Sequence, residues 1–307
     1  MNILVTGGAG FIGSHVADAY LLTQHTVVIV DDLSSGTREN VPRGARFYRV
    51  DIRDEERLSK VFRREKIQAV NHHAAQMDLR KSVEDPAFDA SVNVVGSLNL
   101  LELCRKHDVR KFIFASTGGA IYGEQERFPA DEDHPLRPLS PYGVAKFAVE
   151  RYLSYYSALH GLEYVSLRYG NVFGPRQNPH GEAGVVSIFA QKMLNGGQPL
   201  INGDGKQTRD YVYVEDAVRA NLLALTSSTS NVFNVGTGIE TDVNTIFQKL
   251  RSITNARSGE KHGPPKEGEQ LRSVLSYVKI QSALGWSPQV DLDEGLRRTV
   301  AFLSQKT

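Results

Sequence analysis

Short apolar runs alternate with longer amphipathic segments from the first residue to Arg168. The apolar runs predict strands at residues 2–6, 26–30, 46–50, 69–73, 111–116 and 164–167. The segments between them predict helices around residues 11–22, 55–64, 86–107 and 142–160. Because these strands are continuously apolar, we expect helices to cover both faces of each one. The pattern therefore predicts an α/β domain built on a doubly wound parallel sheet.

This regular alternation of strands and helices ends after Arg168. Glycine and proline cluster at residues 174–175, 196–197, 203–205 and 263–265, and the strand patterns become shorter. One buried-strand pattern returns at residues 231–235. We therefore expect a large domain over residues 1–168, rejoined by a strand near residues 231–236, and a smaller α/β domain over residues 169–307.

Composition and charge exclude several classes of protein. The 36 basic and 35 acidic residues leave a net charge of +1, which argues against a broad surface for nucleic acid or an anionic membrane. A single cysteine, Cys104, excludes an intrachain disulfide framework and a cysteine-rich metal site. No apolar run reaches the roughly 18 residues that span a bilayer, and the N-terminus lacks a basic signal region. We expect a cytoplasmic protein that binds no metal.

Three glycines lie between the first predicted strand and the first predicted helix. Gly7, Gly10 and Gly13 would let the backbone turn tightly and approach a pyrophosphate at the helix N-terminus. Asp31 ends the second strand, where a carboxylate can accept hydrogen bonds from ribose hydroxyls and repel a 2′-phosphate. Each feature alone is also compatible with a plain turn or a solvated strand end. Together they predict a dinucleotide site that prefers NAD to NADP.

A tyrosine and a lysine share one face of the helix predicted at residues 142–160. Tyr142 and Lys146 are four residues apart, and they form the only Tyr-x-x-x-Lys pair in the chain. A nearby ammonium is expected to lower the pKa of a phenol, which then acts as a general base. The preceding strand ends in Ser116-Thr117, at the sheet edge where ligands bind in this architecture.

These features belong to a longer series of motifs. The series comprises Thr6-Gly-Gly-Ala-Gly-Phe-Ile-Gly13, Asp31-Asp-Leu-Ser-Ser-Gly36, Asp51-Ile52, His73-Ala-Ala-Gln76, Asn93-Val-Val-Gly96, Ser116-Thr-Gly-Gly-Ala-Ile-Tyr-Gly123, Ser140-Pro-Tyr-Gly-Val-Ala-Lys146, Arg168-Tyr-Gly-Asn171, Gly181-Glu-Ala-Gly-Val-Val186 and Arg209-Asp-Tyr211. In these motifs the chain resembles the extended short-chain dehydrogenase/reductase family, and within it the UDP-glucose 4-epimerases. The resemblance runs in register from residue 1 to about residue 300.

The resemblance implies a Rossmann-like NAD-binding domain and a catalytic trio of Thr117, Tyr142 and Lys146. Tyr142 would remove the proton from the sugar 4-hydroxyl while C4 gives a hydride to the nicotinamide. Thr117 would hydrogen-bond the same oxygen, and Lys146 would bond the nicotinamide ribose. The 4-keto sugar would turn over and take the hydride back on its other face.

The resemblance also implies two sets of binding residues. It assigns NAD binding to Gly7, Gly10, Phe11, Ile12, Gly13, Asp31, Asp32, Ser35, Gly36, Asp51, Ile52, His73, Ala74, Ala75, Gln76, Asn93, Ser116, Tyr142, Lys146 and Tyr169. It assigns UDP-sugar binding to Thr117, Tyr142, Asn171, Val185, Asn202, Arg209, Lys266 and Glu269. Lys266 and Glu269 stand where the family usually has Arg and Asp, and Asn202 where many relatives have an aromatic residue.

Several functions fit the same trio. We expect interconversion of UDP-glucose and UDP-galactose, with UDP-GlcNAc/UDP-GalNAc or UDP-glucuronate as alternative substrates. Ser273 is expected to leave room for an N-acetyl group at the sugar 2-position. Related dehydratases and decarboxylases carry an acidic residue shortly after the Ser/Thr, whereas this chain has Gly118-Gly119. A non-catalytic NAD-binding sensor is the remaining alternative, and it predicts loss of the tyrosine or lysine. In similar proteins the two long helices form a four-helix dimer interface, so we expect a homodimer.

Overall fold

The computed structural model describes residues 1–179, 184–266 and 270–305, and the chain forms two compact units. Unit 1 consists of Met1–Ile121, Pro138–Arg168 and Val218–Phe233. Unit 2 consists of Tyr122–Arg137, Tyr169–Ala217 and Asn234–Thr307. The chain therefore leaves and re-enters each unit, and helix α9 and strand β11 both span a boundary.

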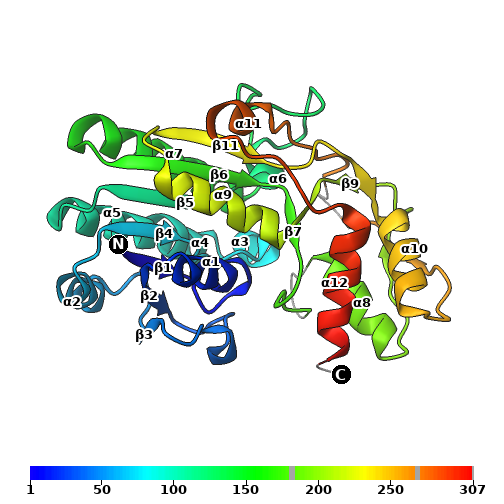
Figure 1. Cartoon of the computed structure of the whole chain (residues 1–307). Helices are drawn as coiled ribbons and strands as arrows, with labels where there is room; N and C mark the ends of the chain where they lie inside the picture. The colour runs from blue at the N-terminus through cyan, green and yellow to red at the C-terminus, as the bar shows by residue number, and fades with distance from the viewer. Residues whose placement is uncertain (180–183, 267–269, 306–307) are drawn as a thin grey trace. The chain divides into compact units, whose positions relative to one another are not determined.

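Seven strands form the main sheet in the described part of the chain (Figure 1). They are β1 (Asn2–Thr6), β2 (Thr26–Asp31), β3 (Arg46–Arg49), β4 (Ala69–His72), β5 (Lys111–Thr117), β6 (Glu163–Tyr169) and β11 (Asn231–Val235). Their order is β11-β6-β5-β4-β1-β2-β3, and β1 pairs in parallel with both β2 and β4. The chain thus builds outward from β1 in one direction and then from β4 in the other. In such sheets ligands bind beyond the carboxyl ends of the strands at this switch point.

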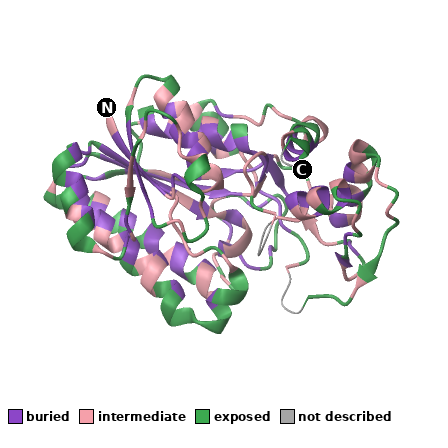
Figure 2. Cartoon of the chain, turned by 90° about the horizontal axis from the view of Figure 1, so that it is seen from below, coloured by how far each residue is buried: buried purple, intermediate pink, exposed green. Residues whose placement is uncertain are grey.

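Helices cover both faces of this sheet. They are α1 (Phe11–Leu22), α2 (Glu55–Glu65), α3 (Leu79–Glu84), α4 (Pro86–Ala90), α5 (Gly96–Lys106), α6 (Gly118–Ile121), α7 (Pro141–His160) and α9 (Val214–Thr226). Residues of α2, α5 and α7 share one apolar core with strand residues such as Leu4 and Val28. On the other face, the Tyr20 hydroxyl of α1 donates to the Asn221 carbonyl of α9 at 3.4 Å. Figure 2 shows buried residues following the strands, with exposed residues on the outer helix faces. This is the doubly wound architecture that the sequence predicts.

The helix predicted over residues 86–107 is divided into three pieces. A π-helical turn, η2 (Ser91–Val95), separates α4 from α5. A Cβ on Gly96 would come within 2.6 Å of the Ile52 side chain, so the backbone of α5 starts in close contact with the loop after β3. Such π-helical turns occur as single-turn bulges inside longer helices, and a prediction of one helix over residues 86–107 does not resolve them.

Unit 2 consists of short strand pairs and a group of helices. The described strands are β7 (Asn171–Phe173), β8 (Ile201–Asn202), β9 (Thr208–Arg209), β10 (Tyr211–Tyr213), β12 (Thr241–Asp242) and β13 (His262–Gly263). The described helices are α8 (Val185–Leu194), α10 (Val243–Thr254), α11 (Val278–Leu284) and α12 (Leu292–Ser304), and α8, α10 and α12 pack side by side (Figure 1). Trp286 is fully buried and donates from Nε1 to the Asp216 carbonyl at 2.9 Å, which anchors the segment before α12. No helix in the described ranges is long and apolar enough to cross a membrane.

A buried ion pair fixes α7 on the sheet within unit 1. The Glu150 side chain is fully buried, and its Oε2 lies 2.7 Å from the Arg168 guanidinium of β6. Its Oε1 accepts hydrogen bonds from Ser116 Oγ of β5 at 2.7 Å and from Ser166 Oγ of β6 at 3.0 Å. Both oxygens are therefore satisfied, as a buried charge requires. The pair joins α7 to two neighbouring strands.

Replacing Glu150 by glutamine is expected to destabilise the protein strongly. The Arg168 guanidinium would stay buried without its counter-charge, and breaking such a pair costs about 3–5 kcal/mol of unfolding free energy. Urea denaturation followed by circular dichroism measures the loss. As a control, Glu56→Gln removes a carboxylate whose side chain is 80% exposed in a surface pair with Lys60, and we expect an unchanged midpoint. Equal midpoints for both variants would show that the buried pair does not stabilise the fold.

Candidate active site

The turn between β1 and α1 contains two glycines at which a side chain would clash with the backbone. Gly7 has a φ of 67°, and a Cβ there would lie 2.6 Å from the Ala74 nitrogen. A Cβ on Gly13 would lie 2.3 Å from the Gly7 carbonyl oxygen. Helix α1 has no side-chain cap and no acidic residue in its first turn. Its first amides, including those of Phe11 and Ile12, are thus arranged to bind an anion such as a pyrophosphate.

Asp31 joins the end of β2 to this glycine turn. Its Oδ2 accepts from the Ala9 amide at 2.9 Å, and its Oδ1 accepts from the Leu33 amide at 2.8 Å. Burial raises the pKa of the Asp31 carboxyl, and the two amide donors oppose that rise. A Cβ on Gly36 would lie 2.7 Å from the Ala9 carbonyl carbon. The segment that carries Asp31, Asp32, Ser35 and Gly36 therefore packs against the glycine turn.

The segment after β4 lies beside the same turn. The Ala74 amide donates to Thr6 Oγ1 at 3.3 Å, which brings residues 73–76 to the end of β1. The Gln76 amide donates to Asn93 Oδ1, and Asn93 Nδ2 donates back to the Gln76 carbonyl, both at 2.9 Å. The structure thus brings Gly7, His73, Ala74, Ala75, Gln76 and Asn93 together, as a common dinucleotide site requires.

Two further predicted cofactor residues follow β3. Ile52 is buried, and its carbonyl accepts from Asn99 Nδ2 at 3.1 Å. The Asp51 carboxylate pairs with Arg53, whose side-chain hydrogen bonds lower the pKa of that carboxyl. Asp51 is therefore charged, but several of its acceptor sites are already used by Arg53.

The three predicted catalytic residues lie on adjoining elements of unit 1. Thr117 ends β5, and its Oγ1 accepts from the Ala120 amide at 3.2 Å. Tyr142 lies in the first turn of α7, where a Cβ on Gly143 would lie 2.6 Å from the Ala120 carbonyl oxygen. This close approach presses the start of α7 against α6, which follows Thr117 directly. One turn later, Lys146 Nζ donates to the Ala115 carbonyl at 2.9 Å and lies 5.7 Å from the Tyr142 ring centroid.

Burial dominates the electrostatics of this pair. It lowers the pKa of Lys146 to about 8, against the opposing effects of Asp89 and Glu150. It raises the pKa of the Tyr142 phenol, and the Asp89 charge raises that pKa further. The sequence leads us to expect that the Lys146 ammonium lowers the pKa of Tyr142, and burial of the phenol acts in the opposite direction. Burial and Lys146 also lower the pKa of His73 to about 3, so His73 is neutral.

The predicted UDP-sugar residues of unit 2 lie on its short strands. Asn171 begins β7 and is the register partner of Tyr211 in β10. Arg209 ends β9, and its guanidinium donates to the Thr208 carbonyl at 2.8 Å. Between them, Asp210 is buried and accepts from Thr237 Oγ1 at 2.6 Å. These contacts hold Asn171 and Arg209 near each other.

The remaining predicted positions are more widely spread. Val185 begins α8, and Tyr169 ends β6 as a buried side chain. Asn202 is the register partner of Gly263 in β13, three residues before Lys266. Glu269 lies outside the described residues.

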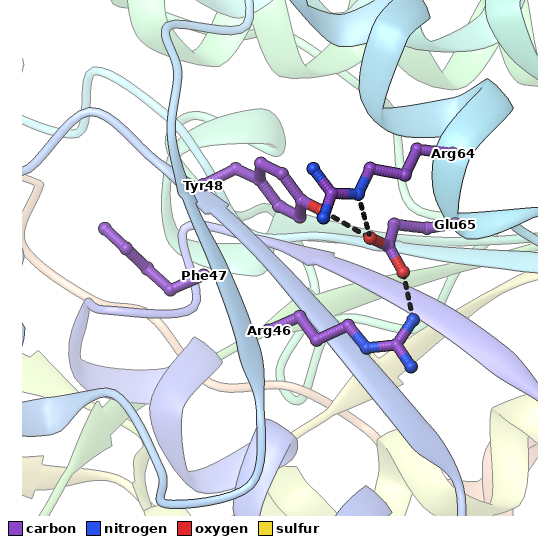
Figure 3. A pocket seen from close by; sticks show the side chains of 5 residues that line it. All are labelled: Arg46, Phe47, Tyr48, Arg64 and Glu65. Atoms are coloured by element: carbon purple, nitrogen blue, oxygen red, sulfur yellow. Dashed lines mark hydrogen bonds and ion pairs between the residues drawn. The ribbon is translucent and has the colours of Figure 1, made fainter.

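A shallow hollow at the far edge of the sheet is not part of this arrangement. It is lined by Arg46, Phe47, Tyr48, Arg64 and Glu65 around strand β3 (Figure 3). The Glu65 carboxylate accepts hydrogen bonds from both the Arg46 guanidinium and the Tyr48 hydroxyl. The polar groups of this hollow thus join the edge strand β3 to α2. The predicted site residues of unit 1 lie elsewhere, at the carboxyl ends of β1, β2, β4 and β5.

Sequence reasoning missed two carboxylates that act on the catalytic pair. Asp89 and Glu150 are both buried, and both raise the pKa of Lys146. Glu150 follows Lys146 by four residues in α7, and that helical spacing was a usable signal. Asp89 has no such signal, because its relation to Lys146 arises only when α4 packs on α7.

Comparisons with known proteins agree with this geometry. The model of the NAD dependent epimerase/dehydratase family matches residues 3–236. A UDP-glucose 4-epimerase from Mycolicibacterium smegmatis is 42% identical over 313 residues, covering 100% of both chains. A UDP-glucose 4-epimerase structure from Thermotoga maritima with UDP-glucose is 50% identical, with a TM-score of 0.98 over 100% of this chain and 99% of that one. A Thermus thermophilus UDP-glucose 4-epimerase in complex with NAD is 47% identical, with a TM-score of 0.94 over 99% of each chain. The chain belongs to the NAD-dependent epimerase/dehydratase family.

Proposed function

We propose that this protein is an NAD-dependent UDP-glucose 4-epimerase that interconverts UDP-glucose and UDP-galactose. The observation that carries the proposal is the placement of Thr117, Tyr142 and Lys146 in the same unit as the glycine turn. Relatives that are 42% and 50% identical over the whole chain bear this name, which supports the assignment.

The residues around the glycine turn fit NAD. Gly7, Gly10 and Gly13 leave the space and the α1 amides for the pyrophosphate. Asp31 would accept hydrogen bonds from the adenosine ribose hydroxyls, and Lys146 would bond the nicotinamide ribose. When bound, NAD supplies an acceptor for the hydride from the sugar C4, returns that hydride later, and adds a positive charge to the site.

The protein's own residues move the proton of the sugar 4-hydroxyl. Tyr142 would take this proton in the oxidative half of the reaction and give it back to the same oxygen in the reductive half. Thr117 would hold that oxygen by a hydrogen bond. Because burial favours the neutral phenol, positive charge is needed to form the phenolate, and Lys146 supplies one such charge below its pKa of about 8.

Residues of unit 2 would bind the nucleoside diphosphate. Arg209 offers a planar fork of donors that matches a phosphate, and Asn171 adds an amide next to it. Ser273 is small and buried, and its amide donates to the carbonyl of Thr208, the residue before Arg209, at 3.2 Å. We therefore propose UDP-GlcNAc as a second substrate.

The cofactor assignment predicts that Gly13→Ala weakens NAD binding. A Cβ 2.3 Å from the Gly7 carbonyl must displace the turn, and such overpacking costs about 1–3 kcal/mol. We expect the dissociation constant for NAD, measured by calorimetry, to rise about tenfold or more. Gly259→Ala is the matched control, since a Cβ there meets nothing within 4 Å. Tighter binding of NADP than of NAD to the wild-type protein would contradict the role of Asp31.

The catalytic assignment predicts that Tyr142→Phe abolishes most turnover. Wild-type protein incubated with UDP-galactose should form UDP-glucose until equilibrium, as measured by chromatography. The variant loses the proton carrier, so kcat should fall about 10²- to 10⁴-fold with bound NAD unchanged. Tyr152→Phe, on the same helix and 40% exposed, should keep wild-type turnover. UDP-GlcNAc and UDP-glucuronate are tested in parallel, and lack of reaction or competition by UDP-GlcNAc would exclude it.

We also propose that two copies of the chain associate through α7 and the helices packed beside it. Val144, Tyr152, Tyr155 and Leu159 are each at least 40% exposed and lie along one stripe of α7. Val95 of the adjoining η2 turn is 50% exposed as well. Large apolar side chains gathered in this way are typical of protein interfaces.

A charge in this stripe should separate the two copies. We expect light scattering to give twice the chain mass for the wild-type protein and a dissociation constant raised at least about tenfold for Leu159→Glu. Leu22→Glu is the control, because Leu22 is 84% exposed at the end of α1 on the other face of the sheet. A wild-type protein that is monomeric at micromolar concentration would refute the dimer.

A further inference from the structure

Asp89 is a buried carboxylate with one oxygen left unbonded by the protein. The residue lies near the end of α4, directly before the η2 turn, and is 1% exposed. Its Oδ1 accepts from Gln76 Nε2 and from Asn93 Nδ2, each at 2.9 Å. Its Oδ2 is buried and has no hydrogen-bond partner among the described residues. Asp85, one turn earlier, is exposed, and its side chain caps the N-terminus of α4. The two aspartates of this helix therefore differ in burial.

The bonds of Oδ1 hold the segment after β4 in place. Gln76 and Asn93 already exchange two backbone–side-chain hydrogen bonds, and Asp89 closes the triangle by accepting from both side chains. The Gln76 side chain also accepts from the Asp78 amide at 2.7 Å. The π-helical turn that begins two residues after Asp89 sets the spacing at which Asp89 and Asn93 both reach Gln76. Such turns are often found at functional sites.

The charge of Asp89 acts on the catalytic pair. Helix α4 packs against α7, the helix that carries Tyr142 and Lys146. The charge of the Asp89 carboxylate raises the pKa of both groups. Within the described ranges, Lys146 makes one hydrogen bond to a protein oxygen, from Nζ to the Ala115 carbonyl at 2.9 Å. A buried ammonium needs a compensating negative charge to stay protonated.

The other ionisable groups around Lys146 supply little of that charge. Glu150, on the same helix, is already paired with Arg168 of β6. His72 and His73, at the end of β4, have pKa values lowered far enough by burial to be neutral. Two carboxylates among the described residues raise the pKa of Lys146, and Asp89 is the one that forms no ion pair with an arginine or a lysine there.

We propose that Asp89 is a positioning residue for the Tyr142–Lys146 pair. Its Oδ1 fixes the segment of residues 73–78 through Gln76 and Asn93, and its Oδ2 supplies the buried negative charge that keeps Lys146 an ammonium. The catalytic part of this role rests on the proposed epimerase function. The electrostatic part does not, because it concerns the proton affinity of one lysine.

Asp89→Asn is the direct test, because the amide keeps the shape and the Oδ1 acceptor but removes the charge. The ε-carbon resonance of Lys146 in ¹³C-lysine-labelled protein, loaded with NAD and assigned by its absence in Lys146→Arg, reports the lysine pKa. We expect that pKa to fall by about one unit in Asp89→Asn. Asp85→Asn is the matched control, and it should leave the resonance titration at the wild-type position. An unchanged pKa in Asp89→Asn would overturn the proposal.

The pH dependence of turnover separates this role from a merely structural one. Because Asp89 raises the pKa of both Tyr142 and Lys146, both limbs of the kcat/KM profile against pH should move to lower pH in Asp89→Asn. If kcat/KM falls at every pH but both apparent pKa values stay unchanged, Asp89 only supports the segment of residues 73–78, and the proposal fails. If the protein turns over no UDP-sugar but the Lys146 pKa still falls, the electrostatic role stands and the epimerase function fails.

Discussion

Burying the ammonium of Lys146 obliges the surrounding structure to supply oxygen atoms and negative charge, because water can no longer do so. The Ala115 carbonyl provides the oxygen from β5, Glu150 lies one turn further along α7, and Asp89 contributes charge from α4. Each of these groups is fixed by other contacts, notably the pair of Glu150 with Arg168. Much of the organisation of unit 1 around α7 follows from this requirement.

The second requirement is that segments of the backbone approach one another closely, and it explains the positions of several glycines. Gly143 lets the start of α7 approach the Ala120 carbonyl, which sets Tyr142 beside the turn that follows Thr117. In the turn after β1, Gly7 allows close approach of the Ala74 backbone, and Gly13 allows close approach of the Gly7 carbonyl. Substitution at these positions therefore acts through the backbone, whereas substitution of Asp89 or Glu150 acts through charge.

Local features of the site could be read from the sequence, and features created by packing could not. The glycine turn, the strand end at Asp31 and the helical spacing of Tyr142 and Lys146 depend on residues close together in the chain. The division of residues 86–107 by a π-helical turn depends on contacts with Ile52 and Gln76 from other segments. The sequence gives the positive charge that neighbours Tyr142, but not the loss of hydration that raises the pKa of its phenol.

The preference for epimerisation over dehydration depends on which side chains stand at residues 118–119, and not on the room available there. A Cβ on Gly119 would meet nothing closer than Thr117 Oγ1 at 3.9 Å, so the fold has room for a side chain there. Glycine cannot carry a proton, and Tyr142 is then left as the acid–base group next to Thr117. A reaction that returns a proton to the oxygen from which it came needs only one such carrier, whereas expulsion of a second hydroxyl requires another acid. The glycine pair at residues 118–119 supplies no second acid beside Thr117, which favours epimerisation over dehydration.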